Sequence, residues 1–315
     1  MATSVLGLKT FAASDPVDVN EVNDNYVKID NGVKTAMQGR AAHNWLDNSD
    51  FRNPVNQRGA TSYSAAGYHI DRWKKENASG TVTVGNNYIA MTGTGAYWFL
   101  TQFVPTNKIK SGAVYTVALA DTSGSVGVCS TVMSTDMTKF TARHTFTSGA
   151  VVAINVEYTS DKYAVYFTSN SSAETRFAWA ALYEGAYDAS TLPAYQPKGY
   201  AAELAECMRY YYRSNDSNSG QDGMIIRRAI NAGNNANAYS LESVDLPVPM
   251  RITPTITVFD SFGNKNYVQE WYSNDQVRNT SIRYANNRSF CVANESRNFI
   301  GGKSYYFNYE ACADL

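Results

Sequence analysis

The sequence predicts a mainly β protein with a short N-terminal helix, a jelly-roll β-sandwich and a second, smaller C-terminal β-sandwich. Two observations favour this fold class: short strands separated by turn residues fill residues 44–187, and strand patterns resume after a proline-containing linker. The chain has 315 residues, enough for two or three domains of ~100–200 residues each. The expected segments are 1–43, 44–187, 188–212 and 213–315.

A helix is predicted near the N-terminus, in SDPVDVNEVNDNYVKIDN at residues 14–31. Asp15 suits the capping position, Pro16 the first helical position, and Asp18 places negative charge on the first turn. Apolar residues then recur in steps of three and four, the spacing of helices that pack side by side. These seam residues are Val19, Val22, Tyr26, Ile29 and Val33. The pattern fits either self-association or an amphipathic helix lying on its own domain.

Residues 44–187 are expected to form the first β region. TVTV alternates at 81–84, GNN turns the chain, and YIAMT returns at 88–92. Further strand-like segments follow at similar spacing, through RFAWAALYEG. About eight to ten such strands without helical patterns between them indicate a β-sandwich or jelly roll.

The segment after the first β region is predicted to be a linker and a short helix. DASTLPAYQPKGY at 188–200 contains two prolines and reads as extended chain. AAELAECMRYYYRS at 201–214 reads as a helix with Leu204, Cys207, Met208 and Tyr211 on one face. Strands of a second β region follow, and PVPMRITPTITV at 247–258 has three prolines before a strand, as at a strand start or sheet edge.

Composition disfavours several partners. The net charge is −1, which gives no electrostatic footprint for nucleic acid. The N-terminus lacks the pattern of a signal peptide, and no stretch approaches ~18 consecutive apolar residues, so membrane insertion is not expected. The chain is therefore expected to be made in a cytoplasm and to leave it by lysis or as part of a particle.

The sequence carries no motif for catalysis, a metal or a cofactor. Its three histidines lack metal-ligand spacing, and HExxH, GxSxG and a Walker loop are absent. A structural Ca²⁺ is compatible with a jelly roll, but no compact acidic loop marks one. The cysteines are scattered without a CxxC pair and are expected to be small buried side chains: Cys129, Cys207, Cys291 and Cys312. No enzyme activity is expected, although a carboxylate pair for glycan cleavage stays open.

Binding chemistry fits the composition better than catalysis does. Sugars stack their C–H faces on aromatic rings, while Asn, Asp, Gln and Arg satisfy the hydroxyl groups. Two adjacent aromatic pairs are the candidate glycan-binding residues, Tyr97 with Trp98 and Trp271 with Tyr272. Each pair is expected in a strand, so that its two rings point to opposite faces. The alternative is that these rings cover a core or a subunit interface.

The stretch HNWLDNSDFRNPVNQRG at 43–59 mixes aromatic, amide and charged residues, and it fits either a ligand site or a scaffold. The scaffold interpretation is favoured. Phe51 and Trp73 are expected in the core, with Asn48, Asn53 and Asn56 in turns. Three arginines are expected to pair with three aspartates: Arg52, Arg58 and Arg72 with Asp47, Asp50 or Asp71.

Several segments together resemble a modular family of bacteriophage and prophage virion proteins of the tail-fibre or receptor-binding type. They are GLKTFAASDPVDVNEVNDNYVKIDNGV, LDNSDFRNPVNQRG, GYHIDRWKK, FAWAALYEGAYDASTLPAYQPKGYAAELAECMRYYYRS and LPVPMRITPTITV. The resemblance implies a carbohydrate-binding-module-like jelly roll after the N-terminal leader and a β-sandwich tip after the second helix. In such jelly rolls an N-x-x-F element, here Asn48 to Phe51, opens the domain, and ALYEG at 181–185 closes it.

The resemblance also implies a function in the virion. The expected protein is a short trimeric fibre that attaches the particle to host surface polysaccharide and docks onto other virion proteins through residues 1–43. The short leader favours a compact fibre over a long slender one. The alternatives are a decoration protein of head, neck or baseplate without a receptor role, and a glycan depolymerase of the particle.

Overall fold

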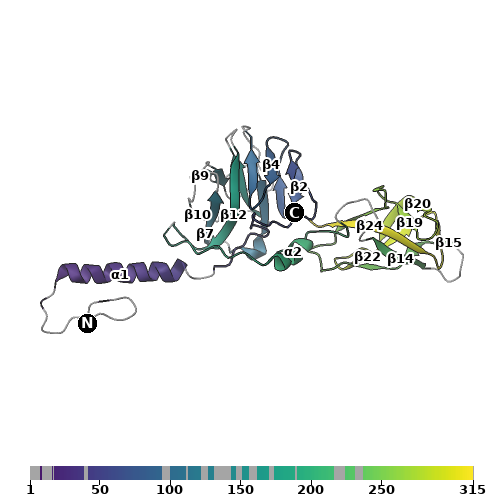
Figure 1. The fold of residues 1–315 in the computed structure, drawn as a ribbon. Coiled ribbons are helices and arrows are strands. Elements are labelled where there is room, and N and C mark those ends of the chain that lie inside the picture. The colour runs from purple at the N-terminus through teal and green to yellow at the C-terminus, as the bar shows by residue number, and fades with distance from the viewer. Residues whose placement is uncertain are drawn as a thin grey trace.

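The structure, a computed structural model, is mainly β in its described part (Figure 1), which confirms the predicted fold class. It describes residues 8, 16, 18–38, 42–93, 100–110, 113–121, 127–130, 143–146, 151–155, 162–169, 174–188, 190–215, 224–230 and 237–314. Helix α1 lies at one end of an elongated arrangement, the first β region follows, and the second β region lies beyond helix α2 (Figure 1).

The N-terminal helix is α1 (Val19–Gln38), which begins and ends later than predicted. Its first turn is capped by Asp18, because the Asp18 carboxylate accepts a hydrogen bond from the Asn20 N–H at 2.9 Å. The predicted cap, Asp15, lies outside the described residues. Among the described residues, no helix has the length and apolar character needed to cross a membrane.

The seam residues of α1 face solvent in the single chain. Val19, Tyr26, Ile29 and Val33 are exposed, and Val22 is half-buried. Exposed apolar side chains at this spacing are the surface that a second helix would cover. Association of the helix stays a prediction.

The first β region consists of two six-stranded antiparallel sheets within the described residues. Its strands are β1 (Ser62–Tyr63), β2 (Gly67–Ile70), β3 (Trp73–Lys75), β4 (Thr81–Val84), β5 (Ile89–Thr92), β6 (Leu100–Pro105), β7 (Val114–Asp121), β8 (Gly127–Ser130), β9 (Arg143–Phe146), β10 (Val151–Asn155), β11 (Lys162–Ser169) and β12 (Thr175–Glu184). One sheet has the order β1-β4-β5-β12-β7-β10 and the other β2-β3-β6-β11-β8-β9. The chain alternates between the sheets, as expected for a jelly-roll sandwich. A short 3₁₀ turn, η1 (Thr106–Lys108), follows β6.

The core of the first β region lies between its two sheets. Trp73 and Phe51 are fully buried, with ring centroids 5.3 Å apart, and Trp73 also stacks on Phe167 at 5.6 Å. The Trp73 indole N–H donates to the Asn48 carbonyl at 2.8 Å, so the ring is buried without losing its hydrogen bond. The prediction that Phe51 and Trp73 anchor the core is confirmed.

The helix predicted at 201–214 is shorter in the structure. α2 (Tyr200–Met208) ends before the tyrosine run, and β13 (Tyr211–Arg213) pairs with the last strand of the chain. Tyrosine favours the strand conformation, and the strand that pairs with β13 lies about a hundred residues later in the sequence. The buried face of α2 also differs from the prediction, because it carries Glu203 together with Cys207.

The second β region is organised around its long last strand. Its remaining strands are β14 (Ile225–Ile230), β15 (Asn237–Ala238), β16 (Ser240–Leu241), β17 (Val244–Asp245), β18 (Thr255–Phe259), β19 (Val268–Glu270), β20 (Gln276–Val277), β21 (Thr280–Arg283), β22 (Ser289–Asn294), β23 (Phe299–Ile300) and β24 (Ser304–Cys312). Strand β24 pairs with β13, β14, β18 and β19. Pro254 directly precedes β18, in agreement with the predicted strand start.

Each β region has its own hydrophobic cluster. The larger cluster runs from Leu46 to Leu182 and the other from Ala229 to Ala313. These limits lie inside the predicted segments 44–187 and 213–315, although the division itself stays a prediction. The expectation of four buried cysteines is wrong: Cys207 is buried, Cys291 half-buried and Cys312 exposed, and the Cys129 side chain lies outside the description.

Candidate functional site

The aromatic pair Trp271–Tyr272 lies in the turn that follows β19. Both rings are exposed, with 48% of Trp271 and 86% of Tyr272 accessible to solvent. The prediction that this pair occupies a strand and points to opposite faces is wrong, because β19 ends at Glu270. The Asn274 N–H donates to the Glu270 carbonyl at 3.0 Å and turns the chain. The other predicted pair, Tyr97 and Trp98, lies outside the described residues.

The turn that carries Trp271 and Tyr272 is held by specific contacts. Trp271 meets Tyr306 edge to face, with 5.6 Å between ring centroids, and the Tyr306 hydroxyl donates to Asn274 Oδ1 at 2.7 Å. Asn274 has a φ of 59°, a left-handed conformation that asparagine tolerates. The backbone under the rings is thus fixed, while large parts of both ring surfaces stay open.

A carboxylate supports the same turn from beneath. Glu270 is nearly buried and accepts a hydrogen bond from the Ser273 N–H at 2.7 Å, with Lys303 Nζ 3.8 Å from its other oxygen. Burial alone raises the pKa of Glu270, but the hydrogen bonds of Ser273 and Tyr272 and the charge of Lys303 outweigh it and leave the pKa below its ordinary value. Glu270 is therefore a fixed anion that orders the turn.

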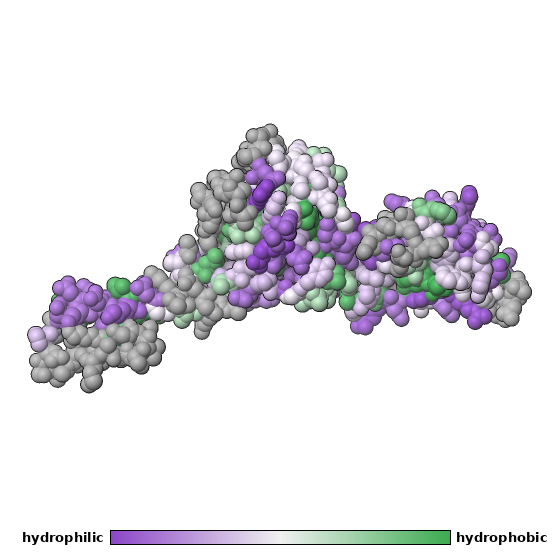
Figure 2. Space-filling view, in the orientation of Figure 1, coloured by the Kyte–Doolittle hydropathy of each residue, from purple (hydrophilic) through white to green (hydrophobic). Residues whose placement is uncertain are grey.

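The turn occupies the end of the second β region that is remote from α2. Glu270 pairs with Tyr305 at the start of β24, whereas the far end of β24 pairs with β13 next to α2. Figure 1 shows β19 and β20 far from both α2 and α1. Over the face seen in Figure 2, α1 and this region are mainly hydrophilic, and hydrophobic residues form small separate areas.

The stretch 43–59 lies at the opposite end of the second β region, where the two β regions meet. Its ion pairs are those predicted: Arg52 with Asp50 at 2.7 Å, Arg58 with Asp71 at 2.9 Å and Arg72 with Asp47 at 3.2 Å.

Residues of this stretch also reach the second β region. Arg58 pairs with Asp314 and lies 3.5 Å from the centroid of the Tyr211 ring, and Gln57 Nε2 donates to the Tyr211 carbonyl at 2.8 Å. On the α2 side, the Asn48 N–H donates to Glu203. These contacts make the stretch the joint between the β regions, which supports the scaffold interpretation.

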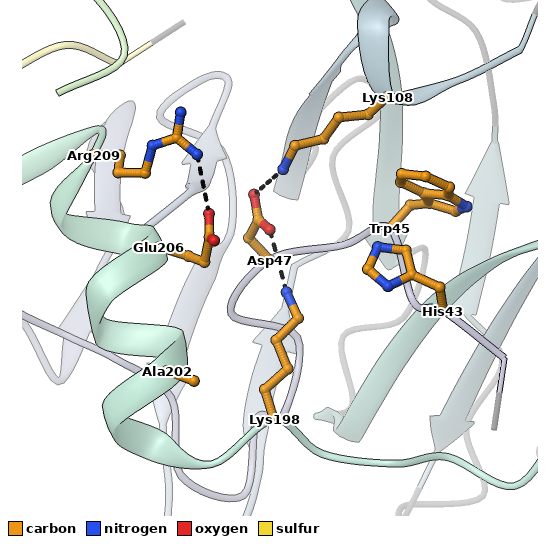
Figure 3. Close-up of a pocket in the computed structure, with 8 residues that line it drawn as sticks. All are labelled: His43, Trp45, Asp47, Lys108, Lys198, Ala202, Glu206 and Arg209. Carbon is orange, nitrogen blue, oxygen red and sulfur yellow. Dashed lines mark hydrogen bonds and ion pairs between the residues drawn. The ribbon is translucent and has the colours of Figure 1, made fainter. Parts of the chain in front are cut away.

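A pocket with a volume of about 330 Å³ opens beside this joint (Figure 3). It is lined by His43, Trp45, Asp47, Lys108, Lys198, Ala202, Glu206 and Arg209. One wall comes from the chain before β1, and the opposite wall comes from α2 and the residue that follows it (Figure 3). Lys108 ends η1, and Lys198 precedes α2.

Asp47 is the charged centre of the pocket wall. It is nearly buried, with Arg72 Nε at 3.2 Å, Lys198 Nζ at 3.4 Å and Lys108 Nζ at 3.6 Å from its oxygens. Burial raises the pKa of Asp47, but these three cations outweigh it and hold the pKa below its ordinary value. Partial burial and the same two lysines lower the pKa of His43, which therefore favours the neutral imidazole.

Only one side of this pocket belongs to the stretch 43–59 that stands out in the sequence. His43, Trp45 and Asp47 belong to the conspicuous stretch, whereas the cationic side chains come from three separate segments, at Lys108, Lys198 and Arg209. None of these three has a local signal, because only the folded chain brings them together. Within the described residues, no group of three or more His, Cys, Asp or Glu is placed to hold a metal ion.

Taken together, the fold and the two sites define a mainly β protein with an aromatic turn at its far end and a charged pocket at its joint. No protein-family model and no curated protein matches the chain. Solved structures that are similar include one described as "CBM4 structure and function", at 12% identity and a TM-score of 0.31, covering 44% of this chain and 99% of that one.

Two further solved structures are similar to this chain. The CBM22-1–CBM22-2 tandem domain of Paenibacillus barcinonensis Xyn10C is 10% identical with a TM-score of 0.29, covering 87% of this chain and 97% of that one. The PBSX exported protein XepA is 12% identical with a TM-score of 0.22, covering 71% and 84%. At these values the likenesses establish neither a family nor a function.

Proposed function

We propose that the chain is a phage virion structural protein, a short trimeric fibre that attaches the particle to host surface glycans. The observation that carries this proposal is the exposed Trp271–Tyr272 pair on an ordered turn at the end of the molecule remote from α1. The resemblance of the sequence to tail-fibre and receptor-binding proteins supports it. The site of action is the virion, and the chain is made in the host bacterial cytoplasm.

The aromatic turn has the chemistry of a sugar-binding surface. Exposed rings stack against the C–H faces of pyranose rings, and neighbouring polar side chains satisfy the hydroxyl groups. Ser273, Asn274 and Asp275 supply such groups beside the two rings. Because the Tyr306 and Glu270 contacts already fix the turn, less entropy is lost when a sugar binds to it.

The turn supports binding better than cleavage. Glycoside hydrolysis requires one carboxylic acid with a raised pKa close to a second carboxylate. The pKa of Glu270, the carboxyl group that holds this turn, is lowered, so this group stays ionised near neutral pH and is unsuited to donate a proton. The proposed role is therefore adhesion without an enzymatic step.

The proposed trimer rests on α1. The seam Val19, Val22, Tyr26, Ile29 and Val33 lies on one helix and is largely exposed in the single chain. Packing three such helices around an axis would bury these side chains, and residues 1–43 would also dock onto other virion proteins. Light scattering is expected to give three times the mass of the single chain, and Tyr26→Ser with Ile29→Ser to give monomers. A monomeric wild-type chain at micromolar concentration would refute the trimer.

The binding proposal is tested on an array of bacterial surface polysaccharides. Trp271→Ala and Tyr272→Ala are each expected to weaken binding about fivefold, since stacking of a sugar on a ring contributes on the order of 1 kcal/mol. Tyr284→Asn is the matched control, because Tyr284 is also an exposed tyrosine but lies in the turn after β21, near the joint. Equal losses for all three variants would refute the assignment of the site.

Two outcomes of the same assay favour the alternative functions. Absence of binding to every polysaccharide and to host cells favours a decoration protein of head, neck or baseplate. Release of new reducing ends from a bound polysaccharide favours a depolymerase.

A further inference from the structure

We propose that the pocket at the joint is a second, independent ligand site, and that it takes a single carboxylated sugar residue of the hexuronic acid type. Helix α2 forms one wall of the pocket, whereas the aromatic turn follows β19, which lies far from α2 (Figure 1), and the two sites share no residue. The proposal rests on three features of the pocket: a ring wall, an excess of positive charge and a fitting size.

The ring wall is formed by His43 and Trp45, whose ring centroids lie 4.4 Å apart at an interplanar angle of 79°. The backbone N–H of Trp45 donates to the Leu182 carbonyl at 3.0 Å, and the half-buried Trp45 ring packs against the core of the first β region. The wall is therefore rigid before a ligand arrives. A wall of this kind presents an aromatic surface to the C–H groups of a sugar ring.

Positive charge exceeds negative charge around the pocket. The cationic side chains outnumber the carboxylates by one: they are Arg72, Lys108, Lys198 and Arg209, against Asp47, Glu203 and Glu206. His43 does not change this balance at neutral pH, since its pKa is lowered by partial burial and by the lysines. An anionic ligand would complete the charge balance.

Among the described residues, the cations that face the pocket make only long ion-pair contacts. Lys198 and Lys108 approach Asp47 only to 3.4 Å and 3.6 Å, and Arg209 approaches Glu206 only to 3.5 Å. Lys198 also lies 3.9 Å from Glu203. Each ammonium group has three donors and each guanidinium five, so one or two long contacts leave donors for solvent or a ligand. A ligand carboxylate would accept charge-assisted hydrogen bonds from these groups.

The size of the pocket limits the ligand to one ring. Its volume of about 330 Å³ lies at the lower end of the ~300–1,000 Å³ that is typical of small-molecule sites. An inorganic anion would use the lysines and leave the ring wall unoccupied, and a neutral sugar would leave the charge excess uncompensated. A hexuronic acid uses both features, because its carboxylate and its ring are joined in one residue.

Calorimetric titration of the full chain with D-glucuronic acid tests the proposal, with D-glucose and acetate as matched probes. Glucuronic acid is expected to bind at least about tenfold more tightly than either probe. Lys108→Gln and Lys198→Gln are each expected to weaken its binding roughly three- to tenfold. Lys110→Gln is the control, because this substitution removes the same charge outside the pocket. Lys110 pairs with Glu184 on the exposed surface.

Three results would overturn the proposal: no saturable binding of glucuronic acid at millimolar concentration, equal affinity for glucose, or equal affinity for acetate. Thermal unfolding checks that each lysine variant is folded, and His43→Ala, at an exposed position, alters the ring wall. Trp271→Ala is expected to leave the calorimetric titration unchanged. The proposal for the pocket at the joint and the proposal for the aromatic turn can therefore be refuted separately.

Discussion

Two stretches of this chain look alike in composition but lie in opposite environments. Residues 43–59 and residues 268–279 each combine tryptophan with asparagine, aspartate, glutamine and arginine. The first forms the joint between the β regions, where Asp47 and Asn48 are almost inaccessible to solvent. The second forms a turn at the far end, where Trp271 and Tyr272 are exposed.

The difference shows that burial decides what such a mixture of residues does. A buried polar group needs a fixed partner, since leaving it unpaired costs about 1–3 kcal/mol. Two side chains of the joint meet this requirement: Asn48 binds Val55 and Asp71, and Arg58 binds Asp71 and Asp314. The aromatic rings of the turn have open faces instead, which is the condition for binding a ligand.

The largest expected difference between the two regions concerns their tryptophans. Trp73→Ala is expected to lower the free energy of unfolding by about 3–5 kcal/mol, because it opens a cavity beside Phe51 and Phe167 and leaves the Asn48 carbonyl without its indole donor. Trp271→Ala is expected to lower it by less than about 1 kcal/mol, because nearly half of that ring is exposed. Urea titration of both variants measures the contrast. Similar losses would show that the turn is part of the scaffold.

Local sequence was sufficient to predict the first strands and their charge pairs. Phe51 and Trp73 were expected in the core from their types and positions, and Arg58 and Arg72 pair with aspartates 13 and 25 residues away. These contacts join residues that are close in sequence, so composition and spacing limit the choices. The fold class was predicted for the same reason, because strand alternation is a local pattern.

Contacts between residues that are distant in the sequence could not be predicted from local sequence patterns. The joint depends on Glu203 and Asp314, which come from the second helix and the C-terminal end of the chain. The position where α2 ends depends on β24, because Tyr211 pairs with β24 as part of strand β13. The exposure of both Trp271 and Tyr272 depends on where β19 stops, and strand boundaries are weakly encoded in sequence.

A change of pH is expected to affect the stability of the two regions in opposite directions. Burial raises the pKa of Asp71 at the joint to about 6, although Arg58 and Gln57 act against it. The ordinary pKa of an aspartate is about 3.9, so the folded chain binds this proton more tightly than the unfolded chain does. The stabilising contribution of Asp71 is therefore complete below that ordinary value and is lost as the pH rises through about 6.

The corresponding carboxyl group at the turn has the opposite behaviour. The pKa of Glu270 is lowered, so its contribution is present above its ordinary pKa and is lost as the pH falls below it. Between pH 7 and pH 4, wild type is expected to gain about 2 kcal/mol over Asp71→Asn and to lose stability relative to Glu270→Gln. Thermal unfolding of the three chains across this range checks both signs, and parallel curves would contradict the contrast.

The smallest expected effect compares two asparagines with left-handed backbone, Asn48 with a φ of 49° and Asn274 with a φ of 59°. Glycine accepts this conformation, so a change to glycine removes only the side-chain contacts. Asn48→Gly is expected to cost about 2 kcal/mol, because the buried Asn48 amide bonds Val55 twice and Asp71 once.

Asn274→Gly is expected to cost less than about 1 kcal/mol, since it loses one contact, with the Tyr306 hydroxyl, at the surface. Urea titration measures both changes. If the two variants were equally destabilised, backbone conformation would explain both sites and hydrogen bonding at the joint would explain neither. A larger loss of stability for Asn48→Gly identifies the buried Asn48 side chain as the structural element that fixes the joint. A small loss for Asn274→Gly shows that the turn can be altered without unfolding the protein.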